Sequence, residues 1–227
     1  MSLLALPYWQ ETAIKLGLAL VVIPTASLIL VYLFLFKMMA FMQSRLGPND
    51  TGPYGSLQLI AEAIKFLQKE DIHPAQADRR VFRMAPVVVL ASTFLLYVVL
   101  PAGPDAVVQN LDTGVFYAMA VSSLSVLGIL MAGWASANKY ALLGGLRAAG
   151  QLIAYELPLI LAVMGVVIQA ETLNLQGIVE AQATGEIFGF GAIGNPFILT
   201  QFLAFLIFMI SAQAELTQTP FDMPVAE

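Results

Sequence analysis

Four carboxylates at or near the ends of apolar segments are the residues of this chain best suited to chemistry. Glu156 lies in the stretch LRAAGQLIAYELP, and Glu215 directly follows the apolar run FLAFLIFMISAQA. Asp222 and Glu227 come next, in ELTQTPFDMPVAE. A carboxylate within hydrocarbon is costly, so such groups usually face the interior of a helix bundle and serve protons, ions or substrates. This pattern indicates a proton relay.

Structural roles are the alternatives for the same residues. Glu156 can pair with a nearby cation, Arg147 or Lys139, or its side chain can snorkel to the membrane interface. Glu215 can simply mark the end of its apolar segment, and Asp222 can cap a helix.

The composition predicts a membrane protein. Hydrophobic residues make up 59 % of the chain and charged residues only 11 %, whereas a soluble protein carries roughly a quarter charged residues. The chain has no cysteine, so disulfides, iron–sulfur ligation and thiolate zinc sites are excluded within it. It has one histidine, His73. No Gly-rich nucleotide loop follows a strand. We therefore expect this chain to bind no flavin, metal or iron–sulfur cluster, and no nucleic acid.

The elements that must position the carboxylates are membrane-spanning helices. A bilayer needs about 20 mostly apolar residues per helix, and backbone groups in hydrocarbon must pair within their own segment. The sequence therefore predicts an all-α integral membrane protein, a single membrane domain over 1–227, with at least five transmembrane helices. Gly128 and Gly133 offer small faces for close helix packing. The expected spans are about 16–36, 84–100, 115–134, 152–168 and 197–214.

The basic residues set the expected topology. Nine of the ten Lys and Arg residues fall between spans 1 and 2 or between spans 3 and 4, and the two other loops between spans have none. Because basic loops stay in the cytoplasm, we expect these segments to be cytoplasmic and the N-terminus to lie outside.

A cytoplasmic amphipathic helix is predicted over about 57–69, between spans 1 and 2. Leu57, Ile60, Ile64 and Leu67 share one face, and polar residues share the other. The helix is too short to span and suits the membrane surface. It is either a surface anchor or the rim of a lateral opening for a lipid-soluble ligand.

Three blocks of this sequence together resemble a known family. They are QSRLGPNDTGPYGSLQLIAEAIKFLQKEDIHPAQADRRVFRMAP (43–86), NKYALLGGLRAAGQLIAYELPL (138–159) and AELTQTPFDMPVAE (214–227). In this order, with apolar spans between them, the blocks resemble the H subunit of bacterial respiratory complex I, the homologue of mitochondrial complex I subunit 1.

The resemblance implies a subunit of a proton-translocating NADH:quinone oxidoreductase in the bacterial inner membrane, without a redox centre of its own. Quinone would be the substrate, entering a tunnel formed largely by this protein. The implied partners are other complex I subunits: the iron–sulfur subunit at the quinone site, the hydrogenase-like large subunit of the hydrophilic arm, small membrane subunits and antiporter-like subunits. The tunnel residues implied are Gln43, Arg45, Lys65 and Phe66, and the relay residues are Glu156, Glu215, Asp222 and Glu227.

The sequence also departs from the family pattern. Leu35 and Phe36 stand where family members have a Glu-Arg pair, Asp50 replaces a basic residue, and Gln218 replaces an arginine. Family members carry further spans beyond the third block. We therefore expect this chain to be a fragment or truncated product, with a complete five-span variant as the alternative.

Two other functions fit the same features. One is the homologous membrane subunit of an energy-converting hydrogenase or formate hydrogenlyase, which shares the carboxylates and needs no quinone chamber. The other is a stand-alone ion carrier, which would remain active without partner subunits.

Overall fold

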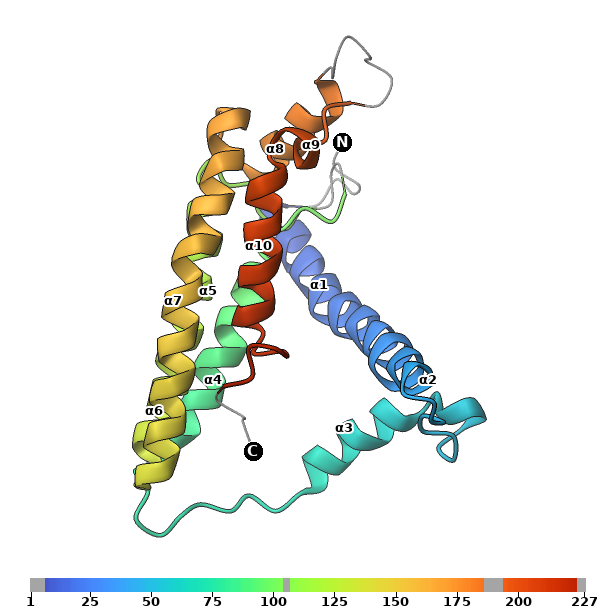
Figure 1. Cartoon of the computed structure of the whole chain (residues 1–227), viewed down its shortest axis with the longest axis vertical. Coiled ribbons are helices and arrows are strands. Elements are labelled where there is room, and N and C mark those ends of the chain that lie inside the picture. Colours follow the sequence, from blue (N-terminus) through green and yellow to red (C-terminus); the bar gives the residue numbers. More distant parts are fainter. Residues whose placement is uncertain (1–6, 104–106, 186–193, 224–227) are drawn as a thin grey trace. The chain divides into compact units, whose positions relative to one another are not determined.

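The chain is all-α. The computed structural model describes residues 7–103, 107–185 and 194–223, and these residues form helices and loops, without a strand. The chain divides into two compact units. One is Ser2–Ile72, and the other is His73–Glu227 together with Met1. Figure 1 shows the helices of both units. The all-α prediction is confirmed.

The N-terminal unit contains one long apolar helix. It runs through α1 (Tyr8–Val31), a π-helical segment η1 (Tyr32–Met38) and α2 (Met39–Met42). A short 3-10 turn, η2 (Pro53–Gly55), and α3 (Gln58–Gln68) follow. The amphipathic helix expected at 57–69 therefore coincides with α3. Its apolar residues Leu57, Ile60, Ile64 and Leu67 are all exposed.

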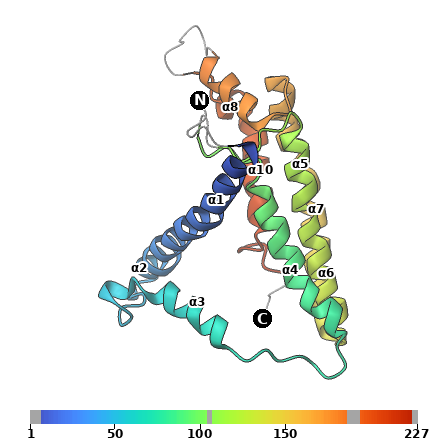
Figure 2. The ribbon, with the colours of Figure 1, turned by 180° about the vertical axis from the view of Figure 1, so that it is seen from behind.

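The second unit is a bundle of helices in which α7 is central. Helix α7 packs against α6 on one side and α10 on another, while α4 packs against α5 and α6. The short α8 lies at the end of the bundle where α10 begins (Figure 2), and α9 lies at the same end (Figure 1). The helices are α4 (Arg79–Leu96), α5 (Gly114–Ser122), α6 (Leu124–Ala135), α7 (Lys139–Ala170), α8 (Leu175–Thr184), α9 (Phe197–Thr200) and α10 (Phe202–Glu215).

Side-chain caps fix where three of these helices begin. Asp78 accepts hydrogen bonds from the backbone N–H groups of Arg80 and Val81 at the start of α4. Asn138 accepts from the N–H of Tyr140 at 2.8 Å, and Asn174 caps α8 in the same way. A capping side chain satisfies one of the N–H groups that the first helical turn leaves without a partner.

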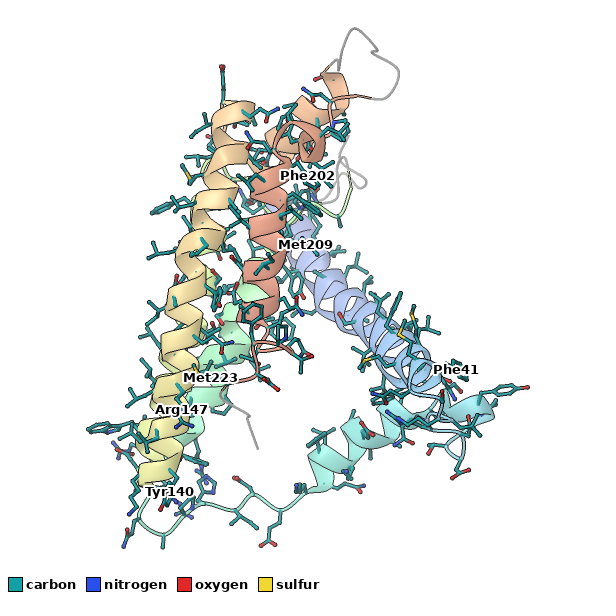
Figure 3. All side chains as sticks on the ribbon, in the orientation of Figure 1. Phe41, Tyr140, Arg147, Phe202, Met209 and Met223 are labelled. Carbon is teal, nitrogen blue, oxygen red and sulfur yellow. The ribbon has the colours of Figure 1, made fainter. Side chains whose placement is uncertain are left out.

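Helix α7 begins earlier than the span expected at 152–168. It starts at Lys139, after the cap on Asn138, and includes Gly144 and Gly145. Good helix formers such as Ala and Leu dominate this stretch. Gly145 also packs closely on α6, since a Cβ there would lie 3.2 Å from the Cα of Gly133. Figure 3 shows Tyr140 and Arg147 on this first part of α7, at the opposite end of the bundle from Phe202.

Three helices in the described part of the chain are long and apolar enough to cross a membrane. They are Tyr8–Met42, Gly114–Ala135 and Lys139–Ala170. Helix α4, which begins with several arginines, and the shorter α10 are not among them, so their crossing stays a prediction. The exposed side of α7 is an apolar stripe at helical spacing, as expected for a lipid-facing surface. It contains Leu146, Ile153, Leu157, Leu161, Met164 and Ile168.

Gly128 lets α6 approach α4 closely, as its small size predicts. A Cβ at Gly128 would lie 2.5 Å from Val89 Cγ2 and 3.0 Å from the carbonyl oxygen of Ala85. Small residues at such crossings allow the backbones of membrane helices to approach and gain van der Waals contact.

We predict that Gly128→Ala destabilises the bundle by about 1–3 kcal/mol, because the added methyl group overpacks the α4–α6 crossing. Gly144→Ala is the matched control, since a Cβ at Gly144 meets nothing within 4 Å. The measurement is the free energy of unfolding in detergent micelles or bicelles. Equal stability of the two variants would contradict the close packing.

Candidate functional site

Glu156 lies on α7 opposite a break in the neighbouring helix. Helices α5 and α6 are separated at Ser123, in the middle of the apolar segment Gly114–Ala135. The Ser123 hydroxyl donates a hydrogen bond to Glu156 Oε1. Both residues are half-buried. A carboxylate away from water is destabilised unless it is hydrogen-bonded, and Ser123 supplies such a bond.

Serine hydroxyls accompany this break. Ser122 Oγ donates to the carbonyl of Met119 at 2.8 Å, and Ser125 Oγ donates to the carbonyl of Ser122 at 2.8 Å. Ser123 Oγ also lies 3.0 Å from the Met119 carbonyl oxygen. Side-chain bonds to the preceding helical turn compete with the backbone ladder and bend helices. The SSLS sequence therefore accounts for the interruption opposite Glu156.

Glu215 is the second carboxylate of this site. It is the last residue of α10, is half-buried, and lies close enough to Glu156 for the two side chains to interact electrostatically. Because α10 packs on α7, residues distant in sequence meet here. The structure thus places two of the four carboxylates that the sequence singles out on neighbouring helices, within electrostatic range of each other.

Gln151 fixes the segment that follows Glu215. Its side chain is only 5 % exposed, and its Nε2 donates to the carbonyl oxygens of Ala214 and Phe221, each at 2.7 Å. The carbonyls of a helix's last turn have no partner within the helix, so Gln151 satisfies one of them. The Phe221 ring also packs edge-on against Tyr155, with centroids 5.0 Å apart. These contacts hold residues 214–221 against α7, one turn from Glu156.

Of the other two predicted relay residues, the structure describes only one. Asp222 is exposed, and Glu227 lies outside the described residues. Gln218, at the place of the family's arginine, is exposed, and its Nε2 lies 3.5 Å from the carbonyl of Leu216.

Cations are not part of the arrangement around Glu156. Over the described ranges, no ion pair joins Glu156 to Arg147 or Lys139. Lys139 Nζ instead lies 5.3 Å from the centroid of the Tyr140 ring. The alternative of a structural ion pair for Glu156 is therefore not what the structure contains.

The four predicted tunnel residues belong to the N-terminal unit and form two local pairs. Arg45 Nε donates to Gln43 Oε1 at 2.7 Å, and both side chains are exposed. Lys65 Nζ lies 5.7 Å from the centroid of the Phe66 ring on α3. In the first pair a cation lies beside an amide, which can hydrogen-bond to a polar ligand. In the second pair a cation lies beside an aromatic ring, which can stack on an aromatic ligand.

The loop between α2 and α3 is held by Lys37 and by a glycine. Lys37 Nζ donates to the carbonyl of Pro48 and to Asn49 Oδ1, each at 2.7 Å. Gly55 has a φ of +75°, and a Cβ there would lie 2.0 Å from the Pro48 carbonyl oxygen. Only glycine fits this close approach. The loop therefore places Gln43 and Arg45 ahead of α3 in a fixed local fold.

An apolar cavity of about 340 Å³ lies farther along α7. Its lining includes Val163 and Val166 of α7 together with Phe197 and Phe205, and it contains no charged side chain. It is therefore separate in character from the carboxylate pair.

Sequence reasoning missed Ser123, Gln151 and Lys37 as parts of these sites. Ser123 contacts the helix that bears Glu156, and Gln151 belongs to that helix. Polar side chains inside a membrane bundle tend to bond across helices. The serine cluster at 122–125 was the available signal for Ser123.

We predict that Gln151→Leu loosens the segment after α10, because the Phe221 carbonyl loses the Gln151 donor and the Ala214 carbonyl keeps only the N–H of Thr217, at a cost of about 1–3 kcal/mol. Faster amide hydrogen exchange at residues 214–223 is the expected result. Gln169→Leu is the control, because Gln169 bonds to Thr200 at an exposed position of the same helix. Unchanged exchange at 214–223 in Gln151→Leu would contradict the role of Gln151.

Comparison with known proteins agrees with the three blocks found in the sequence. The model of the NADH dehydrogenase family matches residues 14–227. The chain is 45 % identical over 191 residues to the H subunit of NADH-quinone oxidoreductase from Brevibacillus brevis, covering 84 % of this chain and 54 % of that protein. It is 42 % identical over 224 residues to the corresponding protein of Geobacillus kaustophilus, covering 97 % of this chain and 64 % of that protein.

A third relative is the H subunit numbered 2 of NADH-quinone oxidoreductase from Syntrophobacter fumaroxidans. It is 45 % identical over 222 residues, which cover 94 % of this chain and 64 % of the relative. The chain thus spans between about half and two thirds of the length of these curated relatives. With the family model matching nearly the whole chain, this chain belongs to the NADH dehydrogenase family.

Proposed function

We propose that this chain acts within the membrane-embedded H subunit of a proton-translocating NADH:quinone oxidoreductase, where Glu156 and Glu215 relay protons between the quinone site and the pumping subunits. The observation that carries the proposal is that two carboxylates on the packed helices α7 and α10 lie within electrostatic range of each other, with a neutral hydroxyl, Ser123, as the hydrogen-bond donor to Glu156. Family membership supplies the reaction with which this pair would be coupled.

Two nearby carboxylates without a cation suit a relay. Interacting acids titrate as a set, so the charge on one changes the proton affinity of the other. A change of charge at the quinone head group would therefore alter the protonation of the pair. Asp222 and Glu227 would extend the relay beyond Glu215. The neutral Gln218 leaves the pair without the positive charge that an arginine would add.

Quinone would enter from the membrane along α3. The exposed apolar face of α3 suits an isoprenoid tail, and Lys65 and Phe66 can contact the head group through charge and stacking. Gln43 and Arg45, in the loop held by Lys37, would line the same tunnel. Reduction would take place where this subunit meets the partner that carries the iron–sulfur clusters.

The location follows from the same proposal. The chain would lie in the bacterial inner membrane with the segments holding Arg45, Lys65 and Arg147 on the cytoplasmic side. Its partners would be the iron–sulfur subunit, the hydrogenase-like large subunit, small membrane subunits and antiporter-like subunits.

We predict that Glu156→Gln, introduced into the full-length subunit of the assembled complex, lowers the number of protons moved per quinone reduced. Glutamine keeps the shape of the side chain and cannot carry the proton, and removing a proton-transferring group typically costs about 10²-fold or more in rate. The measurement is proton uptake by vesicles alongside NADH oxidation. Glu171→Gln, at the exposed end of the same helix, should behave like the parent. Parent-like proton uptake in Glu156→Gln would overturn the relay.

A photoreactive quinone analogue should label α3 in the assembled complex. We expect Phe66→Ala to weaken competition by quinone about tenfold, the effect of losing one aromatic contact with the quinone head group. Phe94→Ala on α4 is the control. Absence of labelling in the parent complex would favour the hydrogenase-type subunit, which has no quinone chamber.

A further inference from the structure

We propose that Ser123 is a positioning residue for Glu156: its hydroxyl turns between Glu156 Oε1 and the carbonyl of Met119, so that Glu156 is hydrogen-bonded in both its charged and its neutral form. This inference rests on the proposed relay role of Glu156 and adds a residue through which that role is carried out. Ser123 does not itself carry the transferred proton.

The geometry gives the Ser123 hydroxyl two acceptors for one proton. Ser123 Oγ is within hydrogen-bonding distance of Glu156 Oε1, and it lies 3.0 Å from the Met119 carbonyl oxygen. A serine hydroxyl has one O–H donor and can also accept. It can therefore donate to only one of these two oxygens at a time.

When Glu156 is charged, the hydroxyl donates to the carboxylate. The Met119 carbonyl then keeps the hydroxyl of Ser122 at 2.8 Å as its donor. Hydrogen bonds to a charged acceptor are about twice as strong as neutral ones, so this orientation is favoured for the anion.

When Glu156 takes up a proton, the directions reverse. The carboxyl O–H donates to Ser123 Oγ, and the Ser123 O–H turns to the Met119 carbonyl. The O–H bond of Ser123 only rotates, and no bond at Ser123 forms or breaks. Neither the charged nor the neutral form of Glu156 is then left without a hydrogen-bond partner. The free-energy cost of an unpaired buried group therefore opposes neither the uptake nor the release of the proton.

Neighbouring serines do not share this position. The hydroxyls of Ser122 and Ser125 bond to carbonyls of their own helical segment, those of Met119 and Ser122. Ser123 is the residue at the break between α5 and α6, and its hydroxyl reaches across to α7. Glu215 is an ionisable group that also acts on this site, through its electrostatic interaction with Glu156.

The first test is spectroscopic and uses the chain alone in lipid nanodiscs. The infrared C=O band of protonated Glu156 is assigned as the band that Glu156→Gln removes. We expect Ser123→Ala to shift this band to higher wavenumber, because the carboxyl group loses its hydrogen-bond partner. Ser123→Thr, which keeps a hydroxyl, should restore the parent position, and Ser125→Ala should leave the band unchanged. An unshifted band in Ser123→Ala would overturn the inference.

The second test uses the assembled complex with the full-length subunit. Loss of one hydrogen bond to a charged group corresponds to about tenfold in rate, so Ser123→Ala should slow quinone-linked proton uptake about tenfold. Ser123→Thr should recover most of it, and Ser125→Ala should match the parent. Parent-like uptake in Ser123→Ala, while Glu156→Gln is impaired, would overturn the positioning role alone.

Failure of the Ser123 inference and failure of the proposed Glu156 relay are distinguishable. Parent-like uptake in Glu156→Gln would overturn the proposed relay, whereas the band position in Ser123→Ala reports on the hydrogen bond without any turnover. If Ser123→Ala does not assemble, Ser123→Cys provides a side chain of similar size with a weaker donor, and its Glu156 band should lie between those of the parent and Ser123→Ala in nanodiscs. A parent-like band in Ser123→Cys would contradict the inference.

Discussion

The constraint on which this structure depends is the need to hold a carboxylate inside an apolar helix. A charged group in hydrocarbon is expensive unless it is paired or hydrogen-bonded. In this chain, Glu156 on α7 receives a hydrogen bond from the hydroxyl of Ser123 instead of a salt bridge with Arg147 or Lys139. A neutral donor stabilises the anion without fixing it as strongly as a cation would. The carboxylate can therefore stay chemically responsive while its position is defined.

The surrounding helices meet the other requirements of this arrangement. Gly128 brings α6 against α4, and Gly133 brings it against α7, so the broken helix α5–α6 lies next to the helix that carries Glu156. On the other side, Gln151 binds the carbonyls of Ala214 and Phe221 and so keeps the end of α10, with Glu215, against α7. Long apolar helices form the frame, and a few polar side chains within it decide where the two acids meet.

Much of the frame could be predicted from the sequence, and less of the site. Apolar runs of membrane-spanning length predicted the all-helical class, and a charged residue in such a run drew attention to Glu156. The start of α7 was missed because the pair Gly144–Gly145 suggests a loop, whereas close packing on Gly133 accommodates these residues in a helix. Ser123 and Gln151 were missed because the sequence does not show which polar residues have a partner on another segment. Their partners, Glu156 and the carbonyls of Ala214 and Phe221, are distant in sequence, so only the packing of helices brings them together.

Glu156 and Glu215 are proposed to behave as one coupled pair. The most direct measurement is the titration of the Glu215 side chain, followed by the carboxyl ¹³C resonance in lipid nanodiscs, in the parent and in Glu156→Gln. Coupled acids respond to each other's charge, so we expect the midpoint for Glu215 to move when Glu156 is replaced and to stay in place in Glu171→Gln. An identical midpoint in the parent and Glu156→Gln would contradict the coupling and, with it, the relay built on this pair.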